Sequence, residues 1–178
     1  IRRRLVEYGH APLLLTFDVA QFTGMRLEEV CQLRLEDIDL KQQTFNIVSA
    51  KTTAGERVVP IATVLLPTIE EACAASVDGY LIDTRTNHHK YGVRSAQLSK
   101  RFGNIKKALN YDDRFVFHSI RRTFATLLQA TGATEHTAAS ILGHSTTGFG
   151  MSFGLYSNGA TQAQMAEAVE AVATVLVS

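Results

Sequence analysis

The sequence predicts a domain of the α+β class, mainly helical and with one small antiparallel β-hairpin. Three observations support this class: apolar residues recur at helical spacing through most of the chain, one segment alternates between apolar and polar residues, and the 178 residues are enough for one hydrophobic core. Hydrophobic residues make up 46% and charged residues 20%, a composition that excludes disordered and collagen-like chains. Because no apolar run reaches the roughly 18 residues of a membrane span, we expect none.

The first part of the chain contains two predicted helices separated by a glycine. Residues 11–22 (APLLLTFDVAQF) are mostly apolar, which predicts a buried helix. Thr23-Gly24 interrupts them, and residues 26–34 follow as a second helix with an apolar stripe at helical spacing. Residues 36–39 (EDID) are mostly acidic and predict a turn that closes this unit.

The next segment carries the β signal of the chain. Residues 44–48 (TFNIV) alternate, and residues 57–61 (RVVPI) are rich in β-branched side chains. Between them, residues 51–56 (KTTAGE) include a glycine and predict the turn of a hairpin, with Lys51 near its tip. Pro60 predicts that the second strand ends there or lies at a sheet edge.

The rest of the chain is predicted to be helical, with two loop segments. Glycines end two of the helices, and the last helix is rich in alanine and valine with an apolar stripe. This stripe can pack on its own domain or on a neighbouring protomer, and the sequence leaves both arrangements open. The predicted helices cover residues 63–76, 94–109, 118–131, 134–142 and 160–176, and the loops cover residues 80–92 and 145–159.

The charges are segregated along the chain in a way that the total conceals. The formal net charge is only +1, from 18 lysines and arginines against 17 aspartates and glutamates. Residues 85–122 contain ten basic and two acidic side chains, a net charge of +8, whereas the remainder carries −7. Such a segment forms either a surface that binds a polyanion or a solvated helix face, and charge alone leaves both open.

Six polar residues have the chemistry to act together on a phosphodiester. Arg26 follows Thr-Gly at a helix start, where backbone N–H groups favour an anion. His118 and Arg121 are spaced i, i+3, so both project from one face of a helix. Taken alone, each of the six residues is also an ordinary surface, capping or packing residue. The inference of a shared site therefore rests on their order and spacing along the chain. The other three are Lys51 in the hairpin turn, His144 directly after a glycine, and Tyr156 after a glycine-containing loop.

This order of residues resembles the tyrosine recombinase (phage integrase) family. TGMRLEEV resembles the family's T-G-x-R-x-x-E-[LV] box, and SAKTTAGERVVPI resembles its lysine-bearing β-turn. HSIRRTFAT matches the H-x-[LI]-R-x-[TS]-F-A-[TS] box, and ILGHS matches the L-G-H-[SK] box. Tyr156 stands where the family has its nucleophile, although the twelve-residue interval from His144 is longer than is usual there. The matching segments are residues 23–30, 49–61, 118–126 and 141–145.

The resemblance implies the fold and activity of the family's C-terminal catalytic domain, spanning residues 1–178 with a C-terminal helix at about 160–178. The family's usual N-terminal DNA-clamping domain is then absent from this chain. The implied activity is that of a site-specific recombinase or integrase of a mobile genetic element, which cleaves and rejoins DNA strands through a covalent 3′-phosphotyrosyl intermediate. The implied partners are double-stranded DNA and further copies of the chain, as a tetramer on DNA.

The resemblance assigns a role to each motif residue, and elementary chemistry supports these roles. Tyr156 attacks phosphorus, and because the pKa of a phenol is about 10 it needs a base, a role that falls to His118. Lys51 acts as the general acid on the departing 5′ oxygen. The groups that hold the phosphate oxygens are Arg26, Arg121 and His144, with Glu29 orienting them. We expect neither a metal ion nor another cofactor.

Other functions remain as alternatives. A type IB topoisomerase shares the chemistry but relaxes supercoils, and the compact frame and the LGHS segment favour the recombinase. A catalytically idle DNA-binding regulatory domain requires a broken constellation, whereas every expected polar group is present. A serine or cysteine hydrolase is poorly supported, since neither cysteine lies in a recognisable nucleophile context. The family, the two cysteines and the lack of a signal-peptide pattern predict a bacterial cytoplasmic protein at the nucleoid, without a membrane anchor.

Overall fold

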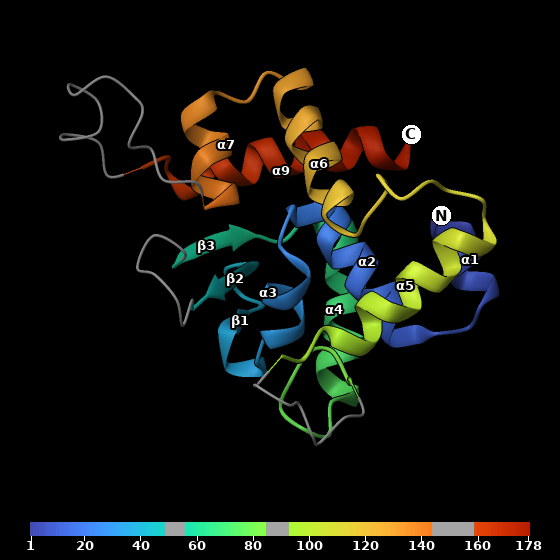
Figure 1. The fold of residues 1–178 in the computed structure, drawn as a ribbon. Helices are drawn as coiled ribbons and strands as arrows, with labels where there is room; N and C mark the ends of the chain where they lie inside the picture. The colour runs from blue at the N-terminus through green and yellow to red at the C-terminus, as the bar shows by residue number, and fades with distance from the viewer. Residues whose placement is uncertain (49–55, 85–92, 144–158) are drawn as a thin grey trace.

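The computed structural model describes residues 1–48, 56–84, 93–143 and 159–178, and in these ranges it is mainly helical with one small antiparallel sheet (Figure 1). This confirms the predicted fold class. The α-helices are α1 (Arg2–Glu7), α2 (Ala11–Thr23), α3 (Leu27–Gln32), α4 (Leu66–Ala75), α5 (Ala96–Ala108), α6 (His118–Ala130), α7 (Glu135–Leu142) and α9 (Gln162–Val177). Two short 3₁₀ helices, η1 (Leu35–Asp37) and η3 (Thr63–Leu65), and the strands β1 (Ile38–Asp39), β2 (Thr44–Ile47) and β3 (Arg57–Pro60) complete the described elements.

Helix α2 is the central element of the core and packs against α1, α3, α5, α6 and α9. Its start is capped by His10, whose Nδ1 accepts a hydrogen bond from the backbone N–H of Leu13 at 3.2 Å. Its end is set by Gly24, which has a φ of 65° in the left-handed region. The predicted buried helix over residues 11–22 and its interruption at Thr23-Gly24 are therefore confirmed.

The sheet has the strand order β1-β2-β3, and both neighbouring pairs are antiparallel. Phe45 of β2 lies opposite Val59 of β3, and both side chains are fully buried, which anchors the predicted hairpin to the core. Pro60 is the last residue of β3, as predicted. The hairpin turn and Lys51 lie outside the described residues.

The prediction of a plain acidic turn at residues 36–39 was wrong. Residues Ile38–Asp39 form β1, a strand that the sequence did not predict, and it pairs with the beginning of β2. Two residues cannot display an alternating pattern, so this strand is defined by its hydrogen-bonding partner rather than by its own sequence.

The N-terminal helix α1 was not predicted either. Its sequence contains three consecutive arginines and no apolar stripe, and Leu5 is its buried residue. A tertiary contact holds it: the guanidinium of Arg2 donates two hydrogen bonds, at 2.7 and 2.9 Å, to the carboxylate of Asp18 on α2.

Helices α6, α7 and α9 gather at one end of the molecule (Figure 1). Helix α9 packs on α6, α7, β3 and α2 of its own chain, with Met165, Val169 and Val172 buried. A second contact comes from the α9 residue Glu170, whose carboxylate accepts hydrogen bonds from the backbone N–H and the hydroxyl of Thr63 at 2.6 and 2.7 Å. In this single chain, α9 therefore packs on its own domain.

None of the helices in the described part of the chain combines the length and the apolar character needed to cross a membrane.

Candidate active site

The turn between α2 and α3 runs tightly against two later helices. A Cβ atom placed on Gly24 would lie 2.4 Å from Cδ1 of Phe124 on α6 and 2.9 Å from Cδ2 of Leu142 on α7. The glycine therefore serves two purposes, because it adopts the left-handed conformation and leaves room for these side chains. This close approach brings the backbone that precedes Arg26 next to α6 and to the end of α7.

Arg26 and Glu29 form a local pair at the start of α3. The backbone N–H of Arg26 donates to Oε2 of Glu29 at 2.8 Å, and its Nη1 donates to Oε1 at 2.5 Å. The side chain of Arg26 is 43% exposed, whereas that of Glu29 is 17% exposed. The carboxylate therefore holds the guanidinium in place at the protein surface.

Arg57 on β3 is a residue of this site that the sequence analysis missed. Its Nη2 donates to Glu29 Oε2 at 2.8 Å, and its Nε donates to the backbone carbonyl of Ile141 in α7 at 2.8 Å. A signal for it existed in the hairpin, because residues two apart in a strand share a face. Arg57 shares its face with the fully buried Val59, and a charge on an inward face needs a partner.

Arg121 projects from α6 into the same region and is 4% exposed. Its Nη1 donates to the carbonyl of Gly24 at 3.0 Å, and its Nη2 donates to the carbonyl of Leu142 at 2.5 Å. These contacts orient the guanidinium plane and connect the turn before Arg26 to the C-terminal end of α7. The carbonyls at a helix end carry partial negative charge, which makes them good acceptors for an arginine.

His118 is the first residue of α6 and is exposed, one helical turn before Arg121. Its pKa is lowered from the usual 6.5, first by partial burial and then by the positive charges of Arg121, Arg122 and Arg26. The lowered pKa favours the neutral imidazole, which is the form that can accept a proton.

The electrostatic balance of this cluster is positive. Burial and the charge of Arg26 lower the pKa of Arg121 to about 10, while Glu29 acts in the opposite direction. Burial opposes ionisation of Glu29, but its hydrogen bond to Arg57 and the charges around it lower its pKa to about 2, so it stays ionised. One carboxylate thus binds the guanidinium groups of Arg26 and Arg57 and also acts on the charge of Arg121, so three positive charges face one negative charge and the cluster favours a bound anion.

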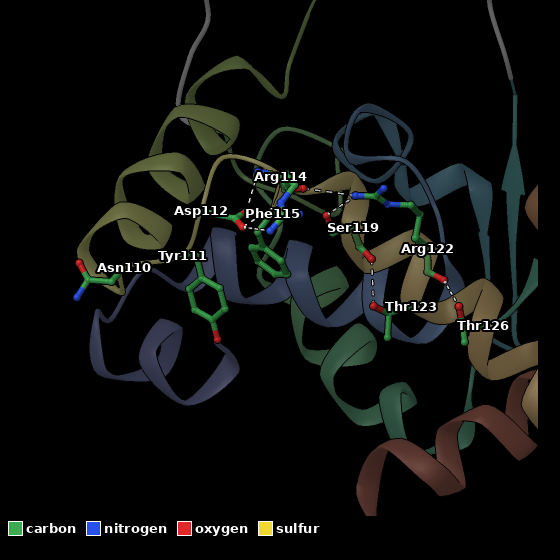
Figure 2. Close-up of a pocket in the computed structure, with 9 residues that line it drawn as sticks. All are labelled: Asn110, Tyr111, Asp112, Arg114, Phe115, Ser119, Arg122, Thr123 and Thr126. Carbon is green, nitrogen blue, oxygen red and sulfur yellow. Dashed lines mark hydrogen bonds and ion pairs between the residues drawn. The ribbon is translucent and has the colours of Figure 1, made fainter.

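An open pocket of about 610 Å³ lies between the exposed face of α6 and the segment that precedes this helix (Figure 2). Arg122 lies at its wall and donates to the hydroxyl of Ser119 at 3.0 Å. Tyr111 stacks on Phe115 at a centroid distance of 4.9 Å and forms the opposite side. The pocket shares no residue with the pair Arg26 and Arg121. It is therefore a neighbouring surface, connected to His118 through the charge of Arg122.

The structure brings four of the predicted site residues into one electrostatic cluster: Arg26, Glu29, His118 and Arg121. The other three, Lys51, His144 and Tyr156, lie outside the described residues. Within the described residues no group of three or more His, Cys, Asp or Glu side chains is arranged to hold a metal ion.

Only some of the basic side chains in residues 85–122 are exposed, and others hold the fold together. Lys106 is 7% exposed and donates to the carbonyl of Asp112 at 3.1 Å. Arg94 lies 3.6 Å from the ring centroid of Tyr80, and its guanidinium donates to the carbonyl of Cys31 at 2.9 Å. Part of the segment therefore supports the fold. The exposed basic side chains that remain in its described part are Lys100, Arg101, Lys107, Arg114 and Arg122.

Known proteins resemble this chain in sequence and in fold. The sequence matches the phage integrase family over residues 4–149. Over 135 residues it is 29% identical to a tyrosine recombinase of Pseudothermotoga lettingae, which covers 74% of this chain and 45% of that protein. The chain thus spans less than half the length of this curated relative.

Two solved structures have a similar fold. The integrase from mycobacterium phage Brujita has a TM-score of 0.66 and 17% identity, with coverage of 92% of this chain and 52% of that one. The integrase of the Tn1549 transposon, in complex with a circular intermediate DNA, has a TM-score of 0.59 and 18% identity, with coverage of 74% and 50%.

Proposed function

The chain belongs to the phage integrase family, and on that premise we propose that it cleaves and rejoins DNA strands in site-specific recombination through a covalent 3′-phosphotyrosyl intermediate. One structural observation supports this proposal independently of the family membership. Arg26, Arg121 and His118 come from two distant helices and share a positively charged cluster that is built on hydrogen bonds to Glu29 and to backbone carbonyls. Such a cluster matches a phosphodiester that gains charge in its transition state.

In the proposed reaction the phenol oxygen of Tyr156 attacks the scissile phosphorus and forms a P–O bond. The phenol proton passes to His118, and the bond to the 5′ oxygen breaks as that oxygen takes a proton from Lys51. Arg26, Arg121 and His144 hold the non-bridging oxygens. Attack by the 5′ hydroxyl of another strand reverses the step, so the energy of the broken bond is retained and no nucleotide cofactor is needed.

The proposed partner is double-stranded DNA, and the solved Tn1549 integrase with its circular intermediate DNA supports this choice at the level of the fold. The proposal extends to a tetramer of the chain on DNA and to action at the bacterial nucleoid. Strand relaxation of the topoisomerase type requires the same cluster and is distinguished by its product.

The test uses a pool of nicked duplexes of randomised sequence, labelled at the 5′ end of the cleaved strand. Each nick lies a few nucleotides beyond the cleavage position, so that the short 5′-hydroxyl product diffuses away. We expect a labelled protein band on a denaturing gel and a phosphopeptide containing Tyr156. Tyr156→Phe should abolish the band, whereas Tyr8→Phe, at an exposed tyrosine of α1's C-cap, should not change it.

Three outcomes would contradict parts of the proposal. A band that persists in Tyr156→Phe would overturn the assignment of the nucleophile. DNA binding in a gel-shift assay without any covalent band would favour the idle DNA-binding domain. Supercoil relaxation without exchange between two duplexes would favour the topoisomerase.

The pH dependence of cleavage should report the charges around His118. Because a base works in its neutral form, the cleavage rate should fall as the pH drops through the pKa of His118, which lies below 6.5 before DNA binds. Arg122→Gln removes one of the charges that lower this pKa, so the acidic limb of the rate should move to higher pH. The measurement is the single-turnover rate between about pH 5 and 8.

Arg114→Gln is the matched control for this shift. Arg114 is 93% exposed and pairs with Asp112, and it is not among the charges that lower the pKa of His118. An acidic limb that is identical in the wild-type chain and Arg122→Gln would contradict the assignment of His118 as the base.

A further inference from the structure

We propose that Arg57 is a positioning residue that couples the Arg26–Glu29 pair to the C-terminal end of α7, so that the phosphate-binding arginines keep one fixed geometry. The consequence for DNA cleavage rests on the proposed function. The coupling itself is a property of the folded chain and can be measured without DNA.

The contacts of Arg57 reach two segments that are far apart in the sequence. Glu29 lies 28 residues before it and Ile141 lies 84 residues after it. The Arg57 side chain is only 6% exposed, and its Nη1 and Nη2 both donate to the carboxylate of Glu29, at 3.3 and 2.8 Å. Since these nitrogens face the carboxylate and Nε faces α7, Arg57 acts on the site through other residues.

The end of α7 is shaped to receive this side chain. Gly143 ends the helix with a φ of 65°, and a Cβ placed on it would lie 2.9 Å from Cδ and Nη1 of Arg57. Arg57 and Arg121 then take the last two helical carbonyls, those of Ile141 and Leu142. Both arginines are thus anchored to the same turn, which directly precedes the motif residue His144 in the sequence.

The result is a closed chain of contacts around the cluster. Glu29 binds Arg57 on one side and the backbone and guanidinium of Arg26 on the other. Arg121 completes the connection by donating to the carbonyl of Gly24, two residues before Arg26. A change at Arg57 should therefore move Arg26 and the end of α7 together, and a misplacement of about 1 Å can slow catalysis about 100-fold.

The first measurement uses NMR on the free 178-residue chain. In Arg57→Met we expect the pKa of the Glu29 carboxyl to rise by at least about one unit from its low value, because its main hydrogen-bond partner is lost. The backbone amide signals of Arg26 and Gly143 should both shift. An unchanged pKa of Glu29, or a shift at only one of the two amides, would overturn the coupling.

The second measurement is a double-mutant cycle on the single-turnover rate of covalent DNA attachment. Arg57→Met and Glu29→Gln should each slow the reaction about 100-fold, and the double variant should be no slower than the slower single variant. Effects that multiply would mean that Arg57 acts independently of Glu29 and would overturn the proposal. Arg34→Gln, which removes an exposed arginine paired with Glu36, is the control and should react at the wild-type rate.

Arg57→Lys keeps the test decisive if Arg57→Met fails to fold. Lysine preserves the charge and the apolar stem but cannot donate to Glu29 and Ile141 at the same time, so we expect a folded protein that reacts about tenfold more slowly. A fully active Arg57→Lys would show that the positive charge alone is needed, and it would overturn the positioning role of Arg57. If the wild-type chain forms no covalent adduct, the proposed function fails, while the NMR measurement still decides whether Arg57 couples the two segments.

Discussion

Replacing Arg121 with methionine should slow DNA strand cleavage by a factor of about 10³, the loss typical of removing a charged group that stabilises the transition state of phosphoryl transfer. Methionine fills a similar volume but cannot balance the negative charge on the non-bridging oxygens of the pentavalent transition state. It also leaves the carbonyls of Gly24 and Leu142 without the two hydrogen bonds from Arg121. The effect on rate should therefore be accompanied by a loss of stability of about 1–3 kcal/mol.

The matched variants for Arg121 separate charge from geometry. Arg121→Lys retains a positive charge but not the planar fork that contacts both carbonyls, so it should recover only part of the rate. Arg114→Gln, at an exposed position paired with Asp112, should cleave at the wild-type rate. The measurement is the single-turnover rate of covalent adduct formation at saturating DNA. A fall of less than about tenfold in Arg121→Met would contradict a direct role in phosphate binding.

Gly24→Ala should lower the free energy of unfolding by about 4 kcal/mol, a large fraction of the roughly 5–15 kcal/mol that is typical of a folded domain. Part of this loss comes from the φ of 65°, which is strained for any residue with a Cβ. The larger part comes from overlap, since the new methyl group would lie 2.4 Å from Cδ1 of Phe124 and 2.9 Å from Cδ2 of Leu142. Denaturant unfolding followed by circular dichroism measures the change.

Gly132→Ala is the control that isolates the overlap. Gly132 has a φ of 86° at the turn after α6, and a Cβ placed there would have no atom within 4 Å. It should therefore show only the conformational cost, about 1 kcal/mol. Equal losses in the two variants would mean that the close contact with α6 and α7 contributes nothing. The difference between them measures how tightly the turn before Arg26 is packed.

The helices were predictable wherever the signal for them is local. Residues 11–22 are apolar throughout, and the glycines at 24 and 143 end their helices in the left-handed conformation. Strand β1 and helix α1 were not predictable, because each is held by a partner that is distant in the sequence. The partner of β1 is β2, and that of α1 is the carboxylate of Asp18.

The same distinction applies to the site. The sequence by itself determined the class of fold, the family and the local pair of Arg26 and Glu29, because residues three apart on a helix start are neighbours in any structure that forms the helix. Only the tertiary structure decided which distant groups meet them. Arg121 reaches Gly24 across 97 residues and Arg57 reaches Ile141 across 84. These contacts depend on how α3, β3, α6 and α7 pack, and packing is a property of the assembled core rather than of any single segment.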